Sequence, residues 1–249
     1  MKLQHIILII ILIILVSPPT ELRAQAGDKG IRMGLKLPYT YDIGYYHRFS
    51  TRIGMYVSSQ IVTMPFSSSV TGLMNLYGAD PKLTAILDES FGFGIGLDHG
   101  WQYHFGTDNR RYYVGLSIQW MSLLKEDIND AVIDDAFADD PIEGCETLDK
   151  CPINPMQKFN DSDVLTINTN YVNMALSFGI TFPLPNNKNS EFRLEGQLAK
   201  TIASRHYLYS DFRYISPISE RTNESLQDIM RKYGWFPSIN LYYIYKLNF

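Results

Sequence analysis

The chain has 249 residues, of which 45% are hydrophobic, 13% aromatic and 19% charged, and its formal net charge is −4. So many apolar residues exclude an intrinsically disordered chain, and the absence of a basic excess argues against nucleic-acid binding. Two cysteines are too few for a disulfide scaffold or a zinc cluster.

The amino-terminal segment has the features of a secretory signal. A basic start precedes an apolar run over 6–16, and the small residues Ala24 and Ala26 follow it. The run is too short for a membrane-spanning helix, which needs about 20 apolar residues. We therefore predict a cleaved signal peptide over residues 1–26, cut after Ala26 or, alternatively, after Ala24. The exported chain, residues 27–249, then forms a single domain with a net charge of −5.

Apolar and polar residues alternate along most of the exported chain. Such a period of two predicts strands with one apolar face. It is plainest at 91–106, where the odd positions are mostly large and apolar and the even positions are mostly glycine or polar. Eight segments share the pattern: 31–37, 41–49, 52–62, 91–106, 111–124, 164–182, 192–202 and 235–249. The connections 38–40, 50–51, 106–110 and 183–190 are short, and the connections 65–90, 125–163 and 207–233 are long.

Three features indicate that the apolar face points outward. The polar face consists mainly of small or neutral residues, whereas a soluble surface is about one quarter to one third charged. Aromatic residues gather at the strand ends, as in the two girdles of a membrane barrel. Those beside the short turns are Phe49, Tyr103, Phe105, Tyr112, Phe182, Phe192 and Phe249, and those toward the long loops are Trp120 and Trp235. The alternation of turn lengths also suits a chain with both termini in the periplasm.

The predicted fold is therefore all-β: an eight-stranded antiparallel up-and-down transmembrane β-barrel with short periplasmic turns and long extracellular loops. The strands must close on one another, because an open edge in hydrocarbon leaves backbone groups unpaired. A secreted soluble ligand-binding barrel, with the apolar face inside, is the alternative reading of the same alternation.

The sequence resembles the small eight-stranded outer-membrane proteins of Gram-negative bacteria, the OmpA/OmpX-like barrels. The resemblance covers the exported chain and is most specific at the carboxyl end, 243–249. It implies an outer-membrane location among lipids, and recognition by the barrel-insertion machinery during assembly. The residues that carry this insertion signal are Tyr243, Tyr245, Leu247 and Phe249.

The inward face carries charges that we expect to pair with one another. An eight-stranded barrel is just wide enough for its side chains to fill it, so a structural ion-pair network is the expected arrangement. A narrow conduction path or a proton relay is the alternative. The predicted network comprises Arg32, Lys36, Asp42, Arg48, Arg52, Asp98, Arg193, Glu195 and Lys246. We expect Gly92, Gly94 and Gly96 to make room for bulky partners such as Tyr56 or Arg193.

The loop 125–163 contains both cysteines and many acidic residues. Cys145 and Cys151 lie six residues apart and are expected to form a disulfide outside the cytoplasm. Residues 125–151 contain ten Asp or Glu and two Lys. A solvated acidic surface is expected there rather than a calcium site, because the EF-hand spacing is missing. We predict no resident metal and no cofactor.

A short helix is predicted over residues 219–233. Thr222 or Asn223 is expected to cap it and Gly234 to end it. Its apolar side consists of Leu226, Ile229 and Met230. We expect the helix to pack over the mouth of the barrel.

The sequence predicts a structural or loop-binding protein rather than an enzyme. Barrels that deacylate lipid A carry His and Ser two positions apart on a strand, and no histidine of the exported chain has a serine two positions after it. His206 with Ser210 and Asp211 is the weak remaining catalytic candidate. The loops 125–163 and 207–233 are candidates for binding an extracellular partner. A lipid-modifying enzyme or a narrow small-solute channel is the alternative function.

Overall fold

The computed structural model describes residues 28–62, 67–107, 110–138, 152–154, 157–158, 164–184, 187–210, 213–214 and 216–247. The predicted signal peptide, Cys145, Cys151, Asp211 and Phe249 lie outside these ranges, as do acidic residues 139–151. Among the described residues, no helix combines the length and the apolar character needed to cross a membrane.

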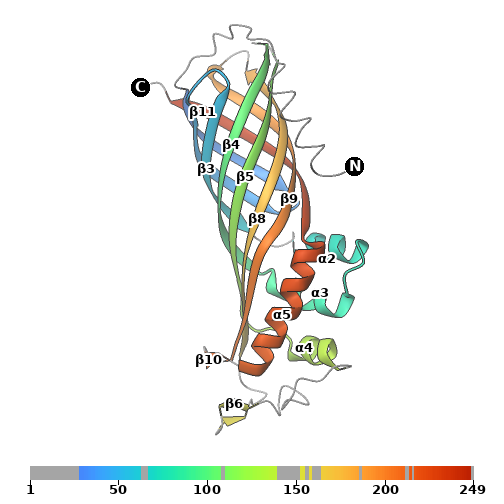
Figure 1. The fold of residues 1–249 in the computed structure, drawn as a ribbon. Helices are drawn as coiled ribbons and strands as arrows, with labels where there is room; N and C mark the ends of the chain where they lie inside the picture. The colour runs from blue at the N-terminus through green and yellow to red at the C-terminus, as the bar shows by residue number, and fades with distance from the viewer. Residues whose placement is uncertain are drawn as a thin grey trace.

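Eight antiparallel strands form a closed barrel (Figure 1). Each strand pairs with the next along the chain, and the last pairs with the first to close the cylinder. The strands are β1 (Lys29–Leu37), β2 (Thr40–Arg48), β3 (Ile53–Val62), β4 (Phe93–Thr107), β5 (Arg110–Lys125), β8 (Leu165–Leu184), β9 (Asn187–Ser210) and β11 (Trp235–Leu247). The predicted fold class is thereby confirmed. Short strands β6 (Pro152–Asn154), β7 (Gln157–Lys158) and β10 (Arg213–Tyr214) lie in the loops.

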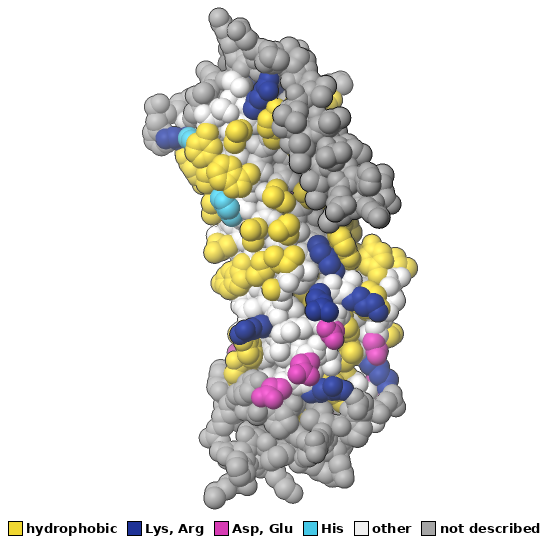
Figure 2. Space-filling model, viewed as in Figure 1, with side chains coloured by type: hydrophobic (Ala, Val, Ile, Leu, Met, Phe, Trp, Pro, Cys, Tyr) yellow, Lys and Arg dark blue, Asp and Glu magenta, His cyan; other side chains and the backbone are white. Residues whose placement is uncertain are grey.

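The outer surface of the barrel is apolar and its inner surface is polar. Phe93 is 60% exposed and Leu116 48%, whereas Gln102 is 2% exposed and Glu195 1%. Figure 2 shows hydrophobic side chains spread over the barrel, and charged side chains gathered where the helices begin. A soluble barrel with an apolar interior would have the opposite distribution, so the burial pattern excludes that alternative.

The β8–β9 hairpin continues beyond the rest of the barrel, which the sequence did not predict. Residues 207–210 belong to β9 rather than to a loop. Thr201 pairs with Asn173 and Ala203 with Val172, so Ile202 is an extra residue in the ladder. This bulge reverses the alternation along β9. The break in period explains why the strand was expected to end at residue 202.

Four helices lie at the end of the barrel that carries the long connections, which we call the loop end. They are α2 (Ser67–Leu76), α3 (Pro81–Ser90), α4 (Asp130–Phe137) and α5 (Ser216–Tyr233). The first three were missed, although Asp80-Pro81 is a typical helix start, and the Asp80 side chain accepts a hydrogen bond from the Lys82 amide at 2.9 Å. Phe91 was expected to face outward on a strand. It follows α3 instead and is buried among the helices.

Helix α5 packs along the free edge of β9 rather than across the barrel mouth. Between Lys200 and Tyr209 this edge of β9 has no strand beside it, because β11 begins opposite Lys200 and β10 pairs only with Tyr209 and Ser210. The Asn223 Oδ1 accepts a hydrogen bond from the His206 amide at 2.8 Å, and the Ser219 hydroxyl from the Leu208 amide at 2.9 Å. These side chains satisfy edge amides that would otherwise be open to another strand.

The predicted details of α5 are partly right. Its apolar side is buried as expected in the cluster shared with β8, β9 and the other helices: Leu226, Ile229 and Met230. The helix ends before Gly234, whose amide donates to the Met230 carbonyl at 2.9 Å. The predicted cap is wrong, because the helix begins at Ser216 and Asn223 lies within it.

Glycines make room for inward side chains, but with partners other than those predicted. Gly92 faces Lys125, Gly94 faces Leu123 and Gly96 faces Met121. It is Gly100 that makes room for the Tyr56 ring.

Two glycines on neighbouring strands give a matched test of this packing. A Cβ on Gly179 would lie 2.2 Å from the buried Tyr113 ring, whereas a Cβ on Gly196 would meet nothing within 4 Å. We expect Gly179→Ala to lower the free energy of unfolding by about 1–3 kcal/mol through overpacking. Gly196→Ala should leave it unchanged or raise it by about 0.4–1 kcal/mol. Urea unfolding in lipid vesicles, followed by tryptophan fluorescence, measures both, and equal losses would contradict this packing.

Candidate functional site

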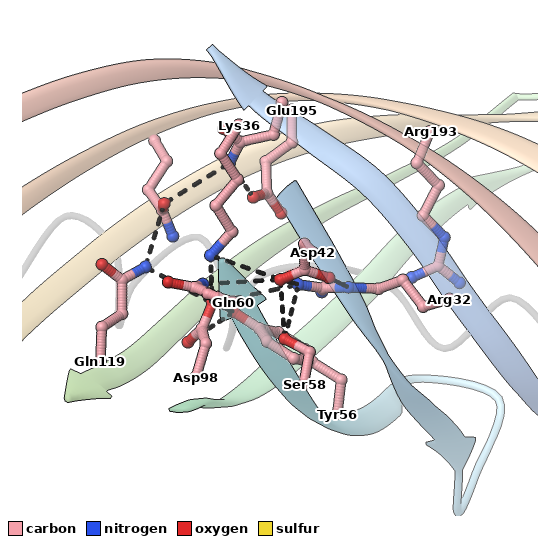
Figure 3. A network of polar contacts seen from close by, with 12 residues as sticks. Arg32, Lys36, Asp42, Tyr56, Ser58, Gln60, Asp98, Gln119, Arg193 and Glu195 are labelled. Atoms are coloured by element: carbon pink, nitrogen blue, oxygen red, sulfur yellow. Dashed lines mark hydrogen bonds and ion pairs between the residues drawn. The ribbon is translucent and has the colours of Figure 1, made fainter. Parts of the chain in front are cut away.

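The centre of the barrel contains a network of paired charges (Figure 3). The Arg32 guanidinium donates two hydrogen bonds to Asp42, from Nε at 3.0 Å and from Nη2 at 3.1 Å. Lys36 donates to Asp98, and its Nζ lies 3.8 Å from Asp42 as well. All four side chains are at most 4% exposed. The structure therefore brings together four of the nine residues predicted for the network.

Neutral side chains extend this network across the lumen. Ser58 donates to Asp42 at 2.7 Å and Gln60 to Asp98 at 3.2 Å. Gln119 on β5 donates to Gln197 on β9 at 3.2 Å. Because these groups come from strands on different sides of the barrel, their hydrogen bonds fill its interior (Figure 3).

A second cluster lies nearer the opposite end, which carries the short turns and which we call the turn end. Arg193 donates to Glu191 at 2.6 Å from Nη2, and to the side-chain Oε1 of Gln102 at 2.9 Å from Nη1. Lys246 lies 3.5 Å from Glu191 and 3.2 Å from Asp28. Glu191 was not predicted, because the strand was expected to begin at residue 192. The residue is nevertheless in phase with Arg193 and Glu195.

Tyrosine rings hold the buried guanidinium groups. The Arg32 guanidinium carbon lies 3.7 Å from the ring centre of Tyr56 and 4.0 Å from that of Tyr242. The Arg193 guanidinium carbon lies 4.1 Å from the ring centre of Tyr46. Cations are attracted to aromatic faces most strongly where water is excluded. The lumen is thus packed by alternating rings and cations, which the sequence analysis did not identify.

Two other predicted residues, Arg48 and Glu195, form hydrogen bonds with neutral side chains. Arg48 is buried and donates to the Tyr46 hydroxyl at 3.2 Å, and Glu195 accepts from Asn240 at 2.8 Å. Neither has an oppositely charged atom within 4 Å among the described residues. Arg52 is a correction: it precedes β3, is only partly buried and donates to the Tyr103 hydroxyl at 3.3 Å. It does not belong to the central network.

The predicted insertion signal is described in part. Tyr245 is 42% exposed on the outer face, and Leu247 ends β11. Tyr243 packs against Phe192, with ring centres 5.4 Å apart. These positions fit an aromatic strand at the turn end, and their role in insertion stays a prediction.

A small cavity separates the charged network from the helices. Its volume is about 40 Å³, enough for a few water molecules. Polar groups from Lys36, Gln60 and Gln119 line one part of it, and apolar side chains including Phe91 and Phe236 line another. The described residues contain no cluster of three or more potential metal ligands.

His206 is buried at the loop end, where both ring nitrogens lie near hydroxyl groups. Its Nδ1 lies 3.0 Å from the Thr169 hydroxyl and its Nε2 3.2 Å from the Ser204 hydroxyl. Burial lowers the pKa of His206 from 6.5 to about 3. Its proposed partner Asp211 lies outside the described residues, so the catalytic hypothesis is left without a geometric basis.

No family model and no curated protein matches the sequence. A major outer membrane protein from Thermus thermophilus is similar in structure over 90% of this chain and 100% of its own, with 8% identity and a TM-score of 0.48. Acinetobacter baumannii CarO is similar over 88% of this chain and 97% of its own, with 8% identity and a TM-score of 0.36. At these values the similarities carry no conclusion about function.

The Lys36–Asp98 pair gives a test of the central network. Asp98→Asn leaves a buried ammonium without its carboxylate and should lower the free energy of unfolding by about 3–5 kcal/mol. Adding Lys36→Met removes the unpaired charge and should recover at least half of that loss. The control is Asp135→Asn, because Asp135 pairs with Lys82 in an exposed position at 3.8 Å, and such pairs contribute only about 0–1 kcal/mol. Urea unfolding measures the wild type and these three variants; a double variant that is no more stable than Asp98→Asn would contradict the pairing.

The lowered pKa of His206 predicts a loss of stability in acid. The unfolded chain takes up the proton below pH 6.5, whereas the folded chain takes it up only near pH 3. Stability of the α5 region should therefore fall as the pH drops through this window, by about 2 kcal/mol at pH 5. Hydrogen exchange of the α5 amides, corrected for intrinsic rates, measures the effect. In His206→Gln the loss of α5 stability between pH 7 and pH 5 should be smaller than in the wild type. An equal loss in both proteins would mean that groups other than His206 cause it.

Proposed function

We propose that this protein is an integral outer-membrane β-barrel of the OmpA/OmpX-like kind. We further propose that its polar lumen is closed by side chains, and that it acts structurally or by binding partners at the cell surface. The observation that carries the proposal is the inverted burial of the barrel, apolar outside and charged inside. An exposed apolar surface of this extent is unfavourable in water, and a lipid bilayer is the solvent that suits it.

Aromatic residues at the turn end support a membrane boundary there. Ring pairs form on the outer surface near the turns. The ring centres are 6.0 Å apart for Phe49 in the β2–β3 turn and Trp101 on β4, 5.9 Å for Phe105–Tyr112 and 6.2 Å for Tyr112–Phe178. At the other end Trp120 and Trp235 are 40% and 41% exposed. Aromatic girdles of this kind occur at both lipid–water interfaces of outer-membrane barrels.

The orientation follows from the connections. Both termini of the barrel domain lie at the turn end, which we assign to the periplasm, and the helices and long loops lie at the other end, which we assign to the outside (Figure 1). Residues 1–26 would direct export, and the strand ending in Phe249 would be recognised by the barrel-insertion machinery. The loops 125–163 and 207–233 would be the parts that meet an extracellular partner.

We propose no enzymatic activity and no open channel. Paired charges, rings and amides occupy the interior of the barrel, and the cavity above them is only about 40 Å³. Purified protein in planar bilayers should therefore show no unitary conductance. Regular conductance steps would instead support the narrow channel. Mass spectrometry of lipid A with and without the gene tests the lipid-modifying alternative, and we expect identical spectra.

Two leucines on one face of β5 test the membrane assignment directly. Leu116 lies halfway between Tyr112 and Trp120, whereas Leu124 lies at the loop end of the strand, opposite Phe93. Leu116→Arg should lower the free energy of unfolding in lipid vesicles by about 2–4 kcal/mol, and Leu124→Arg by about 0–1 kcal/mol. Reversible urea unfolding in vesicles gives both values. Equal values, or recovery of wild-type protein from cells without detergent, would contradict insertion.

A further inference from the structure

An open groove lies on the outside of the helical region, between the α2–α3 turn and the second half of α5. Its volume is about 1060 Å³. Residues 78–81 and Leu83 line one wall, and residues of α5 including Ser225, Ile229 and Tyr233 line the other. The groove is separate from the charged lumen and from the cavity above it.

The groove lies at the edge of the apolar belt, by which we mean the exposed apolar outer face of the barrel. Contacts at the carboxyl end of α5 hold it there. The Lys200 ammonium donates to the carbonyl oxygens of Arg231 and Lys232 at 2.6 and 3.3 Å, which satisfies the last turn of the helix. The same ammonium lies 4.9 Å from the ring centre of Trp235. On β9 the belt ends at Ile202, which is 51% exposed. The groove therefore opens at the boundary that we assign to the outer leaflet.

Two apolar side chains project beside the groove. Leu76 ends α2 and is 78% exposed, and Tyr77 is 51% exposed. Val70 of α2 and Tyr39 in the turn between β1 and β2 line the same small cavity above the charged network. Helix α2 thus lies near the barrel rim, and Figure 2 shows a gathering of hydrophobic side chains on this projection. Such exposed apolar groups favour the interface of a membrane over water.

Two cations line the groove without ion-pair partners. Arg231 and Lys232 are exposed, and neither lies within 4 Å of a carboxylate among the described residues. Lys232 lies over the Tyr233 ring at 4.9 Å. Two carboxylates also line the groove, Asp80 and Asp228, and that of Asp80 already accepts the Lys82 amide. Lys200 adds a third positive charge at the groove's membrane side.

We propose that this groove binds the phosphate-bearing headgroup of an outer-leaflet lipid. Arg231 and Lys232 contact the phosphate, the acyl chains lie against the belt beside Trp235, and Leu76 and Tyr77 enter the interface. The charge complementarity favours an anionic lipid, since basic residues at a membrane surface attract anionic headgroups. This inference rests on the proposed function, because it needs the belt to be embedded in a bilayer.

Native mass spectrometry of the purified full exported chain in detergent tests the proposal. The probes are dioleoyl phosphatidic acid and dioleoylglycerol, which differ only in the phosphate. We expect the wild type to bind phosphatidic acid about tenfold more tightly. Arg231→Gln with Lys232→Gln should reduce this preference to within about twofold. The matched control, Arg205→Gln with Arg221→Gln, removes two charges from the same end of the molecule and should keep it.

Three outcomes would overturn the proposal. These are the absence of a phosphate preference in the wild type, an equal loss in the control, and displacement of the lipid by inorganic phosphate at the same concentration. The last would indicate a site for a free anion. Flotation of every protein with liposomes distinguishes this failure from failure of the proposed function. If the wild type floats but shows no preference, only the lipid site is wrong; if it does not float, the membrane assignment itself fails.

Discussion

The architecture depends on neutralising charge inside a cylinder that has no room for bulk water. Arg32, Lys36 and Arg193 are buried, and each has a carboxylate from a strand of the same barrel within hydrogen-bonding distance. A buried ion pair contributes little net stability, because desolvation offsets the attraction, but removing one partner costs several kcal/mol. The pairs therefore act chiefly to exclude other registers. If a strand shifted its register by one residue, its charged side chains would face the outer surface and its apolar side chains would face inward.

Small residues make this arrangement geometrically feasible. Arg32 is paired in register with Gly44, and Asp42 with Gly34, so each charged side chain faces a strand position without a side chain. Gly34 also lies against the Tyr242 ring, where an added Cβ would be 2.2 Å from the nearest ring atom. The glycines thus leave space in which rings and guanidinium groups stack. The side chains inside the barrel are therefore complementary in shape as well as in charge. Because they fill the interior, they leave no wide passage through it.

The strands were predictable because a period of two survives in the sequence over long segments, and the composition of the polar face decided which side lies outward. Cross-lumen contacts were not predictable in this way. Gln119 and Gln197 are separated by 78 residues, and they meet because β5 and β9 both pair with β8 in a strongly curved sheet. The end of β9 was missed because the bulge at Ile202 shifts the phase, and Glu191 because its strand begins earlier than the turn composition indicated. In each case the deciding information lies in pairing between strands rather than in a local pattern.

Because side chains fill the barrel interior, the outer surface and the loop end are the parts of the protein that can bind other molecules. The β8–β9 hairpin extends past its neighbours and would leave an open edge, which α5 covers through Asn223 and Ser219. That cover places the last turn of α5 at the rim, because Gly234 and Trp235 must return at once to the barrel. The cations at the end of the helix consequently lie beside the apolar belt. Helix α5, which covers the edge of β9, thereby places positive charge at the level where the lipid headgroups would be. The proposed lipid site is thus a consequence of how α5 covers the β8–β9 hairpin.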